Sequence, residues 1–254
     1  MRFHRMLACL ALTFALPLSA WSVDAPRTDA PKLAPKDSAN ADVPKKNDPT
    51  KWEKDIAKFE ASDKANPPKK GQVLFVGSSS IRLWNLKKSF PDLDAINRGF
   101  GGSQIEDSTY FAGRIVLPYQ PRLIVMYAGD NDIASGKSPT QVADDFKAFV
   151  AKVRGKAGDT SADAKAPAPA PIIYIAIKPS IARWKLVDKV REANKLIREF
   201  CEKGDKLTFL DIETPMIGDD GKPKAELFVK DNLHLSEAGY KVWDELLKPH
   251  LDKK

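Results

Sequence analysis

The chain has 254 residues, and its 41 Lys and Arg against 34 Asp and Glu give a formal net charge of +7. The lysines are scattered, and the sequence has neither an aromatic RNA-binding signature nor a basic recognition helix, which argues against nucleic-acid binding. The part with regular apolar patterns, about 200 residues, is long enough for one substantial hydrophobic core.

Residues 1–22 have the features of a secretory signal peptide. Two arginines precede an apolar run over residues 7–18, and small residues follow at Ala20 and Ser22, after either of which we expect cleavage. The run is shorter than the roughly 20 residues of a membrane-spanning helix. We therefore expect an exported protein, periplasmic or secreted, without stable membrane insertion.

Residues 23–50 are a predicted disordered spacer, because they are rich in Ala, Pro, Asp and Lys and have few large apolar groups to offset the entropy of ordering. Residues 51–254 are predicted to form a single domain that starts with a helix over 52–65. A low-complexity segment at 155–171 interrupts this domain, and we interpret it as a surface insertion without a chemical role.

Apolar runs of strand length alternate with amphipathic helical patterns through the domain. The runs lie at 73–76, 123–127, 172–177 and 207–212, with a weaker one around 95–97. The helical stripes are Val142, Phe146, Phe149 and Val150, then Leu186, Val190, Ala193 and Ile197, and finally Val242, Leu246 and Leu247 in a helix capped by Ser236. This alternation predicts a three-layer α/β/α fold with a flavodoxin-like, doubly wound, parallel five-stranded sheet.

Polar clusters follow the predicted strands. In chain order they are "GSSS" (77–80), "NRGFGGSQ" (97–104), "AGDND" (128–132), "KPSIARW" (178–184) and "DNLHLS" (231–236). The reactive site of an open α/β sheet forms beyond the carboxyl ends of its strands, so we expect these segments to meet there. One serine of "GSSS" could be a nucleophile or a helix cap, and the residues alone do not choose among the three.

The small number of histidines limits the candidates for a catalytic base. Beyond the signal peptide only His234 and His250 remain, and His250, near the chain end, suits a helix C-terminus or solvent. Asp231 precedes His234 by a spacing that lets a carboxylate reach imidazole Nδ1 and leaves Nε2 free to accept a proton. A structural His–Asp pair has the same spacing, but the serine and glycine clusters favour catalysis. No HExxH or Cys/His cluster points to a metal.

Cys201 would be the only cysteine left after signal cleavage, so no intramolecular disulfide is expected. It lies within an amphipathic pattern, and we predict a small core residue rather than a nucleophile.

Four of these blocks, "FVGSSS", "NRGFGG", "YAGDND" and "DNLH", resemble in order the motif blocks of the SGNH (GDSL-type) hydrolases, over residues 73 to about 250. Together with "SIRLW" and "IKPSIARW", they look most like exported esterases related to the catalytic subunits of platelet-activating-factor acetylhydrolase. The resemblance implies the SGNH hydrolase fold and a catalytic triad of Ser79, Asp231 and His234. The chain departs from the family at Ser78, where the G-D-S motif has aspartate.

The same resemblance places the glycine of the second block on Gly102 and the asparagine of the third on Asn131. Their N–H groups, with the backbone N–H of Ser79, would form an oxyanion hole. From the residues alone, Asn131 could instead serve as a turn residue and the glycines could serve loop geometry only. The glycine spacing does not fit nucleotide-binding motifs, and the spacing of an EF-hand is absent.

Ser180, Arg183 and Trp184 follow the fourth predicted strand and are candidates to line the substrate cleft, unless Ser180 caps a helix and Trp184 packs. We expect a serine esterase that acts through an acyl-enzyme on a small-molecule, lipid or glycan ester, with no metal or organic cofactor. The alternatives are an acyltransferase on the same residues and a non-catalytic binding protein with a vestigial site. A common α/β-hydrolase is disfavoured, because the G-x-S-x-G elbow is missing.

Overall fold

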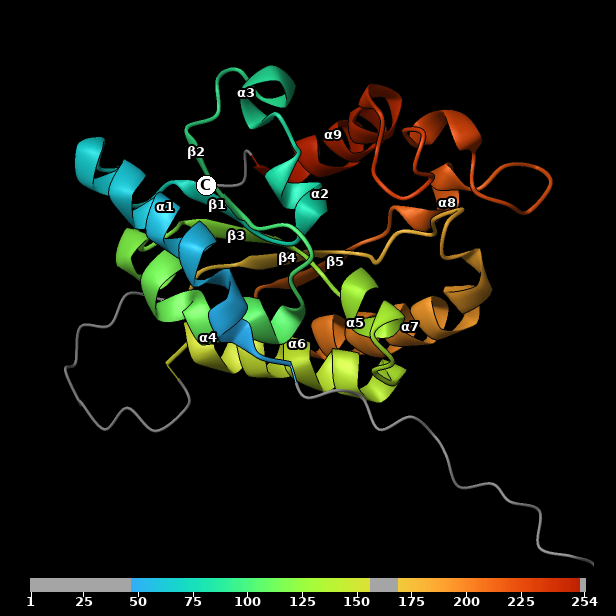
Figure 1. Ribbon diagram of the computed structural model, residues 1–254, viewed down its shortest axis with the longest axis horizontal. Helices are drawn as coiled ribbons and strands as arrows, with labels where there is room; N and C mark the ends of the chain where they lie inside the picture. The colour runs from blue at the N-terminus through green and yellow to red at the C-terminus, as the bar shows by residue number, and fades with distance from the viewer. Residues whose placement is uncertain (1–46, 156–168, 252–254) are drawn as a thin grey trace, which may run out of the picture. The chain divides into compact units, whose positions relative to one another are not determined.

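A computed structural model describes residues 47–155 and 169–251. The predicted signal peptide (1–22), most of the predicted spacer (23–50) and most of the low-complexity segment (155–171) lie outside these residues. The described residues form a parallel sheet of five strands with helices on both faces, as the apolar pattern predicts (Figure 1).

All neighbouring strands of the sheet are parallel, in the order β2-β1-β3-β4-β5. Their bounds are β1 Val73–Gly77, β2 Ala95–Gly99, β3 Leu123–Tyr127, β4 Ile172–Ile175 and β5 Leu207–Leu210. The register pairs Gly77 with both Gly99 and Tyr127, so the three strands end together. The strand order reverses between β1 and β3, and open α/β sheets bind ligands beyond the strand ends at such a reversal.

The helices divide into two layers, one on each side of the sheet (Figure 1). One layer holds α1 (Glu53–Ala65), α4 (Ile105–Ile115), α6 (Pro139–Val153) and α7 (Val187–Lys203). The other holds α2 (Ser79–Arg82), α3 (Leu86–Ser89), α8 (Glu213–Met216) and α9 (Glu237–Leu251). The short α5 (Asp130–Ala134) follows β3, and 3-10 turns lie at Pro49–Trp52, Leu117–Tyr119, Trp184–Leu186 and Ala225–Leu227.

Two hydrophobic cores hold the layers together, and β1 contributes to both. Leu74 and Val76 pack against the layer of α4 and α6, whereas Val73 and Phe75 pack against the layer of α2 and α9. All four are fully buried, at about 1.5–3 kcal/mol for each large side chain removed from water. Burial on both faces explains why the strand is an uninterrupted apolar run rather than an alternating one.

The fourth and fifth strands end two residues earlier than predicted. Asn194 of α7 accepts a hydrogen bond from the N–H of Ile177 at 2.8 Å and donates to its carbonyl at 2.9 Å, so a side chain replaces the sheet partner. After β5, Asp211 accepts from the N–H of Glu213 at 2.9 Å, which turns the chain into α8. Local side-chain bonds of this kind compete with the strand ladder.

The last helix begins where predicted and buries Leu247 as expected, but Trp243 lies in the core in place of Val242 and Leu246. The hydroxyl of Ser236 accepts from the N–H of Gly239 at 3.2 Å, as a helix cap does. Trp243 is fully buried, while Val242 and Leu246 are partly buried at the margin of the core.

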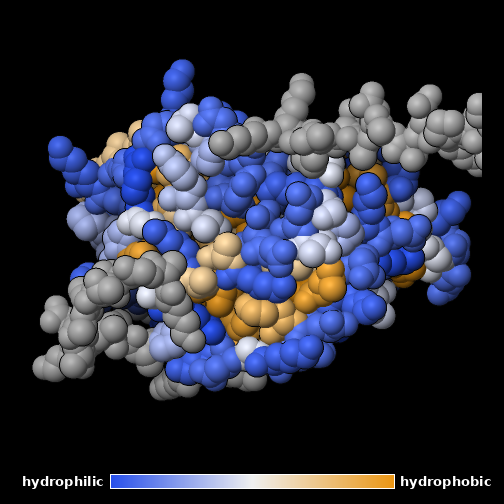
Figure 2. Space-filling model, turned by 90° about the horizontal axis from the view of Figure 1, so that it is seen from below, coloured by the Kyte–Doolittle hydropathy of each residue, from blue (hydrophilic) through white to orange (hydrophobic). Residues whose placement is uncertain are grey.

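The face that carries α4, α6 and α7 is largely hydrophilic, with an apolar area near the middle of the view (Figure 2). On this side a groove of about 270 Å³ has lining residues from α6 and α7.

Across residues 47–155 and 169–251, none of the helices combines the length and apolar character needed to cross a bilayer.

Candidate active site

Ser79 is the first residue of α2, immediately beyond the carboxyl end of β1. Gly77 makes the tight turn possible, because its φ is +135° and a Cβ there would lie 1.9 Å from the carbonyl oxygen of Tyr127. The turn buries Ser78 and Ser80, which are 2% and 1% exposed, and leaves Ser79 partly exposed on the wall of a cavity. The fold therefore singles out Ser79 among the three consecutive serines.

The imidazole of His234 lies between Ser79 and Asp231. Its Nε2 is 3.0 Å from Oγ of Ser79, and its Nδ1 is 2.6 Å from Oδ2 of Asp231. These bonds join three side chains from two segments of the chain that are 155 residues apart. The structure thus brings the predicted triad together in one hydrogen-bonded series.

The carboxylate of Asp231 is fixed by the turn that leads to the histidine. Oδ1 accepts from the N–H groups of Leu233 and His234, both at 2.9 Å. The hydrogen bond from the His234 side chain, followed by these backbone bonds, lowers the pKa of Asp231 to about 2. An ionised Asp231 requires the proton of a neutral His234 to lie on Nδ1, which leaves the Nε2 lone pair for the hydroxyl of Ser79.

Two backbone N–H groups on the cavity wall are available to a ligand. Within the described residues, neither the N–H of Ser79 nor that of Gly102 has a hydrogen-bond acceptor. Gly102 has a φ of +81°, and a Cβ at this position would lie 3.2 Å from the ring of Trp52. A larger residue would strain the loop and crowd the tryptophan, so glycine sets the direction of this N–H.

Asn131, the second residue of α5, lies on the same cavity wall. Its Nδ2 donates to the carbonyl of Ser103 at 3.0 Å, and its Oδ1 accepts from Arg183 Nη1 at 3.2 Å and Nη2 at 3.1 Å. The second N–H of Nδ2 has no acceptor in the described part of the chain. Asn131 is therefore placed as a third donor beside Ser79 and Gly102.

The cavity has a volume of about 450 Å³. Its lining residues are Asp55, Ser79, Arg82, Gly101, Gly102, Asn131, Arg183, Leu233 and His234. Among them Leu233 is the only aliphatic side chain contributed by the described residues, and most of the others carry polar or charged groups.

Of Ser180, Arg183 and Trp184, which were expected to line the substrate cleft, only Arg183 lies on the wall of this cavity. Ser180 is 3% exposed and sits beneath the surface, and its Oγ has no hydrogen-bond partner among residues 47–155 and 169–251. Trp184 opens a 3-10 turn and packs under the guanidinium of Arg191, 5.6 Å from its ring centroid. Trp184 thus follows the alternative that it packs, whereas within the described chain the Ser180 side chain neither lines the cavity nor caps a helix.

Four cavity residues were not among the predicted site residues. Gly101 and Leu233 directly precede Gly102 and His234, and Arg82 ends the helix that begins at Ser79, so their neighbourhood could have suggested them. Asp55 comes from α1, outside every motif, and no sequence signal marks it.

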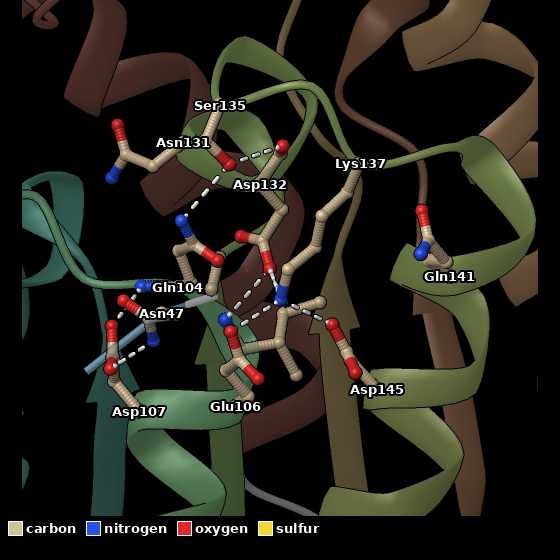
Figure 3. A network of polar contacts seen from close by, with 12 residues as sticks. Asn47, Gln104, Glu106, Asp107, Asn131, Asp132, Ser135, Lys137, Gln141 and Asp145 are labelled. Carbon is tan, nitrogen blue, oxygen red and sulfur yellow. Dashed lines mark hydrogen bonds and ion pairs between the residues drawn. The ribbon is translucent and has the colours of Figure 1, made fainter. Parts of the chain in front are cut away.

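A partly buried ion network adjoins Asn131 and ties α5 to the start of α4 (Figure 3). Asp132 is fully buried, and its Oδ1 accepts from the N–H of Ile105 at 3.1 Å and lies 3.4 Å from Nζ of Lys137. Lys137 also pairs with Glu106 at 2.9 Å and Asp145 at 2.6 Å. Burial raises the pKa of Asp132 to about 6, against the pull of Lys137. The loop that bears Gly102 is thereby anchored to the helix that bears Asn131.

Within residues 47–155 and 169–251, the other histidine and the cysteine lie away from this cavity. His250 is in the last turn of α9, and Cys201 is buried in the core on α7, where burial raises the pKa of its thiol to about 12. Within the described ranges, no group of three His, Cys, Asp or Glu residues is placed to hold a metal ion.

The sequence profile of the GDSL-like lipase/acylhydrolase family matches residues 82–242, starting just after Ser79. The chain belongs to the GDSL-like lipase/acylhydrolase family, and it is by class a carboxylic ester hydrolase. No curated protein sequence matches it.

Solved structures share the fold at low sequence identity. A candidate platelet activating factor protein from Streptococcus pneumoniae is 20% identical with a TM-score of 0.67, over 80% of this chain and 94% of the other. A GDSL-like lipase from Bacteroides thetaiotaomicron is 18% identical with a TM-score of 0.65, over 78% and 97%. An acetyl-xylooligosaccharide esterase from Geobacillus stearothermophilus is 14% identical with a TM-score of 0.52, over 73% and 96%. At these identities the likeness establishes the three-layer SGNH hydrolase fold.

Proposed function

We propose that the chain is an exported serine esterase that cleaves carboxylic esters through an acyl-enzyme. The observation that carries the proposal is the pair of contacts on His234, 3.0 Å to Ser79 and 2.6 Å to Asp231. This arrangement supplies a hydroxyl nucleophile, a general base and a carboxylate that fixes the base, which is the set that nucleophilic ester cleavage requires.

In the proposed mechanism, Oγ of Ser79 attacks the ester carbonyl carbon while Nε2 of His234 accepts the hydroxyl proton. Asp231 stays ionised and stabilises the imidazolium that forms. The carbonyl oxygen becomes an oxyanion, which accepts hydrogen bonds from the donors of Ser79, Gly102 and Asn131.

Collapse of this intermediate breaks the bond to the alcohol oxygen, which takes the proton from His234, and leaves the acyl group on Ser79. His234 then accepts a proton from water, whose oxygen attacks the acyl carbon. Collapse of the second tetrahedral intermediate breaks the bond to Oγ of Ser79, which takes the proton from His234, and releases the acid.

The cavity lining favours substrates with a short acyl group and a polar alcohol. Its wall carries charged side chains from Asp55 and Arg82, and its volume is about 450 Å³. A long acyl chain gains its binding free energy by burying methylene groups against apolar surface, at about 0.8 kcal/mol each. Leu233 alone offers little of that surface among the described lining residues.

Export is proposed from residues 1–22, with their arginines, apolar run and small residues before the expected cleavage. Sequencing the N-terminus of protein recovered from the periplasm or medium tests it. A mature chain that starts at Trp21 or Val23 is expected, whereas an uncleaved Met1 would contradict export by this route.

The test of catalysis compares two neighbouring serines. Ser79→Ala is expected to reduce hydrolysis of p-nitrophenyl acetate by about 10³-fold or more, with the melting temperature unchanged. Ser78→Ala is the matched control, because Ser78 makes no side-chain cap bond, and it should retain activity. Wild-type turnover by Ser79→Ala would refute the proposal.

A further inference from the structure

The direction of the Asn131 amide is set by a residue from a different strand end. An amide can turn either its oxygen or its nitrogen to a neighbour, but a guanidinium has only donors. Both Nη atoms of Arg183 donate to Oδ1 of Asn131, at 3.2 and 3.1 Å. The amide oxygen must therefore face Arg183, and Nδ2 must face the carbonyl of Ser103 and the cavity that Asn131 lines.

Arg183 is itself held in place by an ion pair with Asp130. Its Nη1 lies 2.7 Å from Oδ1 of Asp130, while Oδ2 of Asp130 lies 2.9 Å from Nζ of Lys178. Lys178, 2% exposed, also donates to the hydroxyl of Tyr127 at 3.0 Å. Burial opposes ionisation of Asp130, but the cations of Lys178 and Arg183 hold its pKa below the usual range.

This ion-paired group fixes the guanidinium as a rigid support. The Asp130 side chain is 7% exposed, and each of its oxygens pairs with one cation. Because Lys178 occupies Oδ2, Arg183 is held at Oδ1. Asp130 also precedes Asn131 directly in α5. The same short helix thus provides both the amide and the carboxylate that holds the guanidinium against it.

We propose that Arg183 is a positioning residue of the esterase, which holds the Asn131 side chain with its N–H toward the developing oxyanion. The inference rests on the proposed function and adds a role for Arg183 that acts through Asn131 rather than on the substrate. Preorganised donors stabilise charge without reorganising during the reaction, and a freely turning amide loses that advantage. Because Arg183 also lines the cavity, a direct contact with substrate is the rival that the experiment must separate.

A double-mutant cycle separates the two roles. The kinetic constants for p-nitrophenyl acetate are measured for wild type, Asn131→Ala, Arg183→Ala and the double variant. Asn131→Ala should lower kcat by about 10²–10³-fold, as removal of one oxyanion donor does. Arg183→Ala should lower kcat by about tenfold with little change in KM, and should cost less than about twofold more once Asn131 is gone.

Two further variants control for folding and charge. Arg183→Lys keeps the positive charge beside Asp130 and one donor for Oδ1, and should recover part of the lost kcat. Arg191→Ala removes an exposed arginine that pairs with Glu213 at 2.7 Å, and should leave kcat unchanged. Circular dichroism melts check that each variant folds. If Arg183→Ala does not fold, Arg183→Lys replaces it in the double-mutant cycle.

The measurements distinguish failure of the proposed function from failure of the positioning role alone. If Asn131→Ala leaves kcat intact, the oxyanion assignment of the proposed function fails and the positioning role fails with it. If Asn131→Ala is impaired but loss of Arg183 still costs its full factor in that background, or mainly raises KM, the proposed function stands and the positioning role is wrong.

Discussion

Replacing Asp231 with asparagine separates the charge of this residue from its shape. The aspartate oxygen Oδ1 accepts two backbone N–H groups at 2.9 Å, and these donors would hold the amide oxygen of the variant in the same place. The NH₂ group then occupies the position of Oδ2, which is 2.6 Å from Nδ1 of His234 in the wild type. Since NH₂ only donates, the imidazole must accept at Nδ1 and carry its proton on Nε2.

With its proton on Nε2, His234 cannot accept the proton of Ser79, which is the task of the base. A carboxylate-to-amide change with this geometry lowers kcat by about 10⁴-fold in a serine protease triad. The side chain of Asp231 is 48% exposed, so water competes with the amide for Nδ1. We therefore expect a loss of about 10³–10⁴-fold in kcat for p-nitrophenyl acetate, with KM little changed.

Nitrogen-15 spectra of histidine-labelled protein provide the direct assay, because neutral Nδ1–H and Nε2–H tautomers have different shifts. The His234 signal should report Nδ1–H in the wild type and Nε2–H in Asp231→Asn. A variant that retains more than about a tenth of the wild-type kcat, or whose tautomer is unchanged while activity is lost, would refute this role of Asp231.

The remaining predictions concern the ion network, the glycine loop and the cavity. The folded pKa of Asp132, about 6, exceeds its ordinary value of 3.8, so its contribution to stability is present below pH 4 and is lost as pH rises through 6. The free energy of unfolding of wild type relative to Asp132→Asn should thus rise by about 2–3 kcal/mol between pH 7 and pH 4 in urea titrations, and a flat difference would contradict this. Gly102→Ala should lower kcat by about tenfold or more, because its φ of +81° strains an L-residue and displaces the N–H; unchanged kcat would exclude Gly102 from the oxyanion hole. In a p-nitrophenyl series, kcat/KM should fall from acetyl to palmitoyl, and a preference for palmitoyl would show that a long-chain surface lies elsewhere.

The sheet could be predicted from the sequence because each central strand is apolar on both faces. Five runs of apolar residues between amphipathic helices admit few arrangements other than a parallel sheet with covered faces. The ends of β4 and β5 could not be placed, because side-chain bonds from Asn194 and Asp211 end those strands. Nothing in an apolar pattern reveals that an asparagine seventeen residues further on replaces a strand partner.

Some features of the site could likewise be predicted from the sequence, whereas others depend on the fold. Asp231 and His234 are neighbours in sequence, so their pairing could be predicted from a turn. The choice of Ser79 over its neighbours came only with the family resemblance, since burial of Ser78 and Ser80 depends on the turn after β1. The contacts of Arg183 with the α5 residues Asp130 and Asn131 join segments about fifty residues apart, and only the folded sheet brings their strand ends together.

The most direct test of the account is covalent labelling with a fluorophosphonate, which forms a stable adduct only with an activated serine. Peptide mass spectrometry of the labelled wild type should place the adduct on Ser79, and His234→Ala should abolish labelling while the fold, followed by circular dichroism, is retained. An adduct on another serine, or labelling of Ser79 that persists at the wild-type rate without His234, would contradict the claim that these side chains act as one nucleophilic unit.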